Sequence, residues 1–226
     1  MSFADIDQLF GTPDIQRGYD ILKKRYDAGD KSSDLLRRLA RCCHELACAT
    51  LDKGKKKGLI FEGKEFAMEG YKMNEDDFEA LKWAGIMVGS ATDHMSTKER
   101  IEEGGNFKAL LDKALEMNNQ DFVLLHMRGR FSHSVASLTW VERKAATILY
   151  SAPPVATMEE ALADFLAAYE LKPDWIENLV WLIRTYLALN DKENAKKSIN
   201  KLLVLTPANE DERDKVNETK KLLAKC

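Results

Sequence analysis

Four positions in the C-terminal third of the chain recur after 34 residues, and this spacing constrains the fold more than any other feature. Both sets combine small and large apolar residues and end on a proline: Ala161, Phe165, Ala168 and Pro173, then Ala195, Ile199, Leu202 and Pro207. A small residue lets two helices cross closely, and a proline ends a helix. We therefore expect stacked pairs of antiparallel helices with a tetratricopeptide-like period.

Helix-start signals agree with this period. Ser, Thr, Asp or Asn followed three residues later by Glu can cap a helix, because each side chain satisfies a free backbone N–H of the first turn. Four such pairs occur: Ser96 with Glu99, Thr157 with Glu160, Asp174 with Glu177, and Asn209 with Glu212. The pattern predicts helices over 157–171, 175–189, 191–205 and 209–224. The last helix is highly charged, as is typical of a solvent-facing cap.

The repeat weakens toward the N-terminus but leaves traces. Gly129 occupies the small position of a helix expected over Phe122–Ala136, and an extra helix is expected from Leu138 to Tyr150, ended by Ala152-Pro153-Pro154. A further unit has small residues at Gly63, Ala67, Gly70 and Gly85, and the first fifty residues contain helices near Asp14–Tyr26 and Ser33–Leu51. The sequence thus predicts an all-α, tetratricopeptide-like helical solenoid of antiparallel helix pairs, with an inserted helix. We expect a single domain, 1–226, with irregular N-terminal helices over 1–52, repeats over 53–205 and a C-terminal capping helix over 209–224.

Composition limits the classes of partner. The formal net charge of −3 gives no general attraction to nucleic acid, so an electrostatic partner must be met by a local patch. The longest apolar run, Trp83–Gly89, is too short to cross a bilayer, and the N-terminus lacks the pattern of a signal peptide. We expect a cytosolic or peripheral protein with reduced cysteines and no integral membrane segment.

No arrangement of residues indicates catalysis or metal binding. Phosphate-binding loops, nucleophile elbows and zinc-protease motifs are absent from the sequence. Cys42, Cys43, His44 and Cys48 are close together, but their spacing fits no zinc site. We therefore expect no enzyme, no cofactor and no metal, and we expect the four tryptophans to lie in the core.

The concave face of a repeat array is built mainly from first helices and is the usual peptide groove. The predicted inward-facing polar residues are Lys82, His126, Arg130, His133, Glu177 and Arg184. Lys82, Arg130 and Arg184 would give the groove a positive floor that suits a carboxylate-rich or phosphorylated segment. The alternative is that they are ordinary exposed cations.

A second candidate surface is the lysine run Lys53, Lys55, Lys56 and Lys57, which we expect in a loop after the Ser33–Leu51 helix. Cations of the neighbouring helices would add to it: Lys23, Lys24, Arg25, Arg37, Arg38 and Arg41. Clustered cations attract an acidic protein surface or an anionic lipid. The alternative is a solvated loop, and the lysines of the 191–205 helix are interpreted as a solvated face.

Several segments resemble the regulator of microtubule dynamics family: His126–Phe131, Ser137–Lys144, Ala152–Thr157 and Glu159–Leu162. Trp83–Gly89 and Lys113–Asn118 are similar to it as well, and the likeness runs from about Asp30 to Leu205. The resemblance implies a non-catalytic, microtubule-associated adaptor in spindle organisation and chromosome segregation. It implies tubulin and other mitotic proteins as partners, and a location in the cytoplasm, on the cytoskeleton and at spindle poles. Two alternatives stay open: a lipid-binding or lipid-transfer module, and a peptide-binding scaffold without direct microtubule contact.

Overall fold

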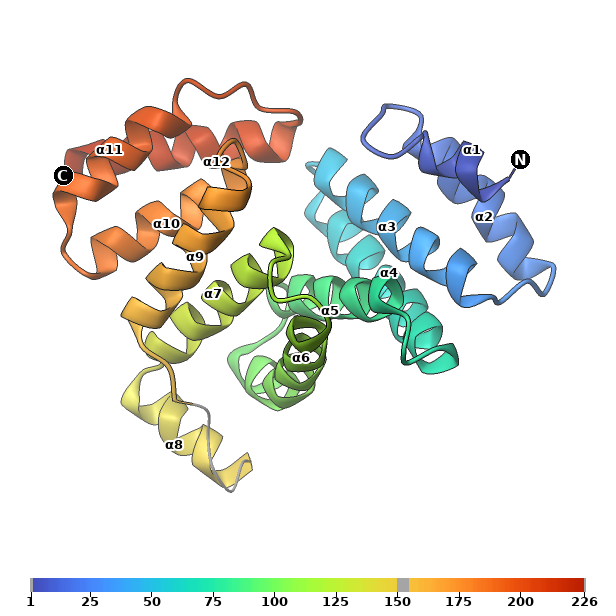
Figure 1. Cartoon of the computed structure of the whole chain (residues 1–226), viewed down its shortest axis with the longest axis horizontal. Coiled ribbons are helices and arrows are strands. Elements are labelled where there is room, and N and C mark those ends of the chain that lie inside the picture. The colour runs from blue at the N-terminus through green and yellow to red at the C-terminus, as the bar shows by residue number, and fades with distance from the viewer. Residues whose placement is uncertain (1, 150–154, 226) are drawn as a thin grey trace. The chain divides into compact units, whose positions relative to one another are not determined.

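The computed structural model describes residues 2–149 and 155–225, and these residues form helices and no strand (Figure 1). The all-α prediction is confirmed. One compact unit ends at Leu110 and the other begins at Leu111; the single-domain assignment stays a prediction. The first unit contains α1 (Phe3–Asp7), α2 (Ile15–Asp27), α3 (Ser33–Ala49), α4 (Lys53–Met73) and α5 (Phe78–Thr92). The unit boundary lies within α6 (Thr97–Met117), and the second unit continues with α7 (Phe122–Ala136), α8 (Trp140–Leu149), α9 (Met158–Leu171), α10 (Ile176–Ala188), α11 (Lys192–Leu202), α12 (Glu210–Lys220) and the 3-10 helix η1 (Lys221–Lys225).

Close helix crossings organise the first unit. A side chain at Gly63 of α4 would meet Cys43 Cβ of α3 at 2.8 Å and would also collide with Met87 of α5. Glycine therefore lets three helices meet at one point. Arg38 then ties α1 to α3, because its Nε donates to Asp7 Oδ1 at 2.8 Å and its guanidinium also bonds Asp34.

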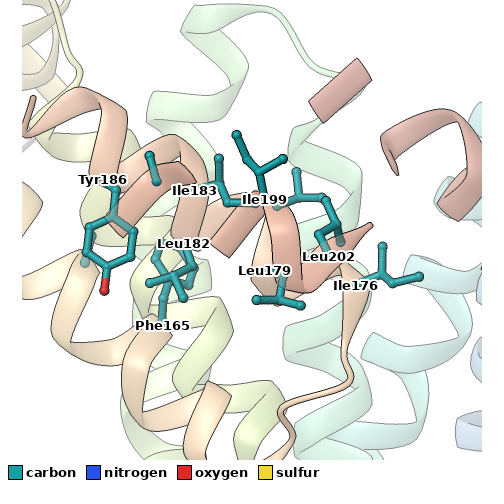
Figure 2. Packing of buried hydrophobic residues seen from close by; sticks show 11 residues of the cluster. Phe165, Ile176, Leu179, Leu182, Ile183, Tyr186, Ile199 and Leu202 are labelled. Carbon is teal, nitrogen blue, oxygen red and sulfur yellow. The ribbon is translucent and has the colours of Figure 1, made fainter. Parts of the chain in front are cut away.

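The second unit contains the predicted repeat in the predicted register. Its core joins residues of α9, α10 and α11 (Figure 2): Ala161, Phe165, Ile176, Leu179, Val180, Leu182, Ile183, Tyr186, Ala195, Ile199 and Leu202. The repeat positions on α9 and α11 are all fully buried. On α7, Gly129 lies against the Phe165 ring, which fills the space that a side chain would occupy.

The predicted caps are largely confirmed. Thr157 and Glu160 form a reciprocal capping box at the start of α9. Ser96 and Glu99 exchange the same pair of bonds. Asn209 accepts from the Glu212 amide, although the Glu212 carboxylate bonds the Ala208 amide instead of that of Asn209.

The prediction that Asp174 caps α10 is wrong. Trp175 is the N-cap residue, without a side-chain cap, and the Asp174 carboxylate instead pairs with Lys172 at 2.8 Å. The nearby cation competes successfully for the carboxylate.

The inserted helix differs from its prediction in two ways. Thr139 bonds the Glu142 amide, so α8 begins at Trp140 and not at Leu138. Trp140 is 70% exposed, with Lys144 over its ring, so the prediction that it lies in the core is wrong. The predicted helix end at residues 152–154 lies outside the described residues. Within the described ranges, no helix is both long and apolar enough to span a membrane.

Replacing Gly129 with alanine tests the close crossing of α7 and α9. The new Cβ would lie 2.8 Å from Phe165 Cε1, so we expect the free energy of unfolding to fall by about 2 kcal/mol. Gly58→Ala is the matched control, because a Cβ there meets nothing within 4 Å and helical alanine is favoured by about 1 kcal/mol. Urea unfolding of both variants checks this. Equal stability of the two variants would contradict the crossing geometry.

Candidate partner-binding surfaces

The predicted groove residues divide between the two units. Lys82 lies on α5 in the first unit, whereas His126, Arg130 and His133 lie on α7 and Glu177 and Arg184 on α10. The α7 residues are spaced by four and then three, which places them along one helix face. The second unit therefore brings five of the six predicted residues onto two helices.

Trp181 is the centre of this surface, although the sequence analysis expected it in the core. The Arg130 guanidinium lies 4.8 Å from its ring centroid, and that of Arg184 lies at 5.1 Å. The His133 ring meets the Trp181 ring edge-on at 5.3 Å. A half-buried aromatic ring thus positions two cations by cation–π contact. Trp181 lies four residues after Glu177 and three before Arg184 in the sequence. This spacing could have predicted that its side chain belongs to the same surface.

Glu177 is neutralised by a residue that the sequence analysis missed. Lys215 of α12 donates to Glu177 Oε2 at 2.5 Å and also pairs with Asp211 at 2.7 Å. Trp181 Nε1 donates to the other Glu177 oxygen at 3.0 Å. Burial raises the pKa of Glu177, but Lys215 and then Arg130 outweigh it and lower the pKa to about 2. The carboxylate is therefore committed to internal contacts, and Arg184 stays exposed beside the Trp181 ring.

His126 lies beneath the surface, with an exposed fraction of 4%. Asn178 Nδ2 donates to the Phe165 carbonyl at 2.9 Å, so its Oδ1 faces His126 Nδ1 at 2.9 Å as an acceptor. The proton of neutral His126 must then be on Nδ1, and Nε2 has no partner within the described part of the chain. Burial, followed by the Arg130 charge, lowers the pKa of His126 to about 4. His126 thus connects α7 to α10 and is not available to a partner's surface.

The lysine run adopts a helix, so the predicted loop is wrong. Lys53, Lys55, Lys56 and Lys57 form the first turns of α4, because Asp52 caps the helix by accepting from the Lys55 amide at 2.9 Å. Lys53, Lys55 and Lys57 are exposed. We call these four residues the α4 lysine cluster.

The neighbouring cations behave differently from this cluster. On α2 and α3 five of the six pair with nearby carboxylates: Lys23 with Asp27, Arg25 with Asp30, Arg37 with Asp34, Arg38 with Asp7 and Asp34, and Arg41 with Glu45. Lys24 is exposed and has no ion pair with a described residue. Lys53, Lys55 and Lys57 have no ion pair with any described residue. The positive potential of the first unit is therefore less neutralised at the start of α4.

Two of the cysteines near the start of the chain, Cys42 and Cys43, are buried and unreactive. Burial raises the pKa of the Cys42 thiol to about 12 and that of Cys43 further. Both thiols are therefore protonated at neutral pH. Over residues 2–149 and 155–225, no three potential His, Cys, Asp or Glu ligands gather at one point.

The lowered pKa of His126 predicts a pH dependence of folding. An unfolded histidine binds a proton near pH 6.5, whereas the buried one does so only near pH 4, so its contribution is complete above pH 6.5 and is lost on acidification toward pH 4. We expect His126→Gln to reduce the loss of unfolding free energy across this window by about 3 kcal/mol. Urea titrations at several pH values measure this. His94→Gln, outside this network, should follow the unmodified protein, and identical pH slopes for both variants would contradict the assignment.

The fold has relatives among solved structures. A thermophilic TPR protein from Thermus thermophilus superposes with a TM-score of 0.66 at 15% identity, covering 97% of each chain. At this identity the likeness shows the fold alone, and it confirms the tetratricopeptide-like architecture.

Sequence comparison identifies the family. The chain is 44% identical over 225 residues to Regulator of microtubule dynamics protein 1 of Caenorhabditis elegans, covering 100% of this chain and 99% of that one. It is 32% identical over 191 residues to the Bos taurus protein of that name, of whose length it spans 60%. The protein-family model for Regulator of microtubule dynamics protein 1-3 matches residues 2–226. This chain therefore belongs to the regulator of microtubule dynamics family.

Proposed function

We propose that this protein is a non-catalytic scaffold that binds microtubules through the α4 lysine cluster and serves spindle organisation and chromosome segregation. The names of the relatives support a role in microtubule dynamics. The exposed Lys53, Lys55 and Lys57, which form no ion pair with a described residue, support a direct electrostatic contact, because tubulin tails are acidic.

The observation that carries the proposal is the position of these lysines. They lie at the N-terminus of α4, where the helix dipole is already positive and cations are disfavoured by about 0.3–1 kcal/mol each. The first turn of α4 contains no acidic residue, and Asp52 alone provides the cap. An acidic surface docked at this end would compensate both the dipole and the lysines. Binding of an acidic partner would explain why the chain retains cations that locally destabilise the helix.

The surface around Trp181 is the proposed site for a second partner. Arg184 is exposed, and its guanidinium is oriented by the Trp181 ring. A planar, pre-oriented guanidinium binds carboxylate or phosphate groups with two parallel hydrogen bonds. An acidic or phosphorylated segment of another mitotic protein fits this chemistry.

The lipid-transfer alternative requires a long apolar cavity. One cavity of the second unit has a volume of about 390 Å³ and lysines along its wall. That volume is near the lower limit for small-molecule pockets, and one wall is formed by polar and charged residues of α11 that do not suit acyl chains. This cavity therefore gives the alternative no support.

Reversing the charge of the α4 lysine cluster should weaken microtubule binding. We expect the combined substitution Lys55→Glu, Lys56→Glu and Lys57→Glu to lower the affinity at least tenfold at low salt, because three attractive charges become repulsive. The fold should persist, since acidic residues suit a helix N-terminus. Co-sedimentation with polymerised microtubules at low and high salt measures the effect.

The matched control reverses three cations of the second unit, Lys192, Lys196 and Lys220, and so changes the net charge equally. It should leave binding within about twofold of the unmodified protein. If both triple variants lose binding equally, the attraction depends on net charge and the α4 contact is wrong. If the unmodified protein fails to sediment at low salt, direct binding is wrong.

A further inference from the structure

A second-unit cavity of about 390 Å³ lies between α9, α10 and α11, away from the Trp181 surface. Its apolar wall consists of Leu166 of α9 with Leu179 and Leu182 of α10. Leu179 and Leu182 belong to the buried cluster of Figure 2, where Tyr186 lies at the edge. Leu166 is 36% exposed, so apolar surface reaches the opening of the cavity. Such a wall accepts one large apolar side chain.

The polar wall of the cavity is rich in hydrogen-bond donors. The Tyr186 and Ser198 hydroxyls line it, and neither has a hydrogen-bond partner among residues 2–149 and 155–225. Lys201 Nζ lies at the same wall and donates to the Tyr169 hydroxyl at 3.1 Å. An ammonium group has three donors, so Lys201 can bond a further acceptor. These groups together favour an anionic ligand.

The electrostatics of α11 agree with an acidic ligand. Lys192, Lys196, Lys197 and Lys201 are all exposed on this helix. Lys197 pairs with Glu193 at 2.6 Å, and Asp191 is used in capping α11. The lysines outnumber the acidic groups on this helix, and Lys197 and Lys201 line the cavity, although Asp191 acts on the Tyr186 hydroxyl more strongly than Lys201 does.

We infer that this cavity binds the apolar side chain of an acidic peptide segment, with the adjacent carboxylates at Lys201 and Tyr186. We commit to a peptide because apolar surface at Leu166 reaches the opening, where the exposed Lys197 and Lys201 can bond carboxylates that extend beyond the cavity. Interface energy is typically concentrated in such apolar anchors, with polar groups at the rim. The inference does not rest on microtubule binding, since it uses none of the α4 lysines.

Fluorescence anisotropy with a labelled synthetic peptide tests the inference. The peptide carries one phenylalanine within a run of glutamates, and two reference peptides replace the phenylalanine with alanine or the glutamates with glutamine. Only the first should bind with a Kd below about 1 mM. We expect Leu166→Glu and Lys201→Gln to weaken binding at least about fivefold, and Tyr186→Phe about threefold.

Lys196→Gln is the matched control, because it removes an equal charge from α11 at a residue that does not line the cavity. It should leave the affinity within about twofold. Circular dichroism confirms that each variant is folded. The inference is overturned if the first peptide does not bind, if the alanine peptide binds equally well, or if Lys196→Gln weakens binding as much as Lys201→Gln.

Discussion

The structure depends on how closely its helices can cross. At Gly129 the α7 backbone takes the Phe165 ring directly against it, and at Gly63 the α4 backbone does the same with groups of α3 and α5. These contacts bring polar side chains of neighbouring helices within reach of each other. The bond from His126 to Asn178 and the pair of Arg128 with Asp164 at 2.6 Å both connect helices that meet at the Phe165 crossing. Steric complementarity thus decides which electrostatic contacts can form.

Local signals in the sequence predicted local structure well. The 34-residue spacing identified the residues that fill the second core, and Thr157 with Glu160 located the start of α9. The sequence did not show where two nearby groups compete for the same side chain. Asp174 had an ordinary capping position, but Lys172 two residues away takes its carboxylate. The lysine run was expected in a loop after the Ser33–Leu51 helix, yet the cap from Asp52 and the apolar face of α4 make it helical.

The candidate sites were predicted only in part, because spacing along one helix does not show contacts with other helices. Counting along α7 and α10 placed Arg130 and Arg184 on facing positions, but periodicity could not show that Trp181 stands between them. Nor could it show that Lys215, 38 residues further along the chain, neutralises Glu177. Burial is a property of three helices together, so His126 was expected at the surface and lies below it. The distinction between paired and unpaired cations likewise requires the tertiary structure.

The contact between Lys215 and Glu177 has a consequence for the order in which the second unit is completed. During synthesis, α7 and α10 leave the ribosome before α12 does, so Glu177 is made before the ammonium group of Lys215 is available. Apart from Lys215, the cation that acts most strongly on Glu177 is Arg130, which also lies over Trp181. With α12 in place Arg130 still acts on Glu177, but its effect is second to that of Lys215. The surface around Trp181 acquires its final charge distribution only when the capping helix docks.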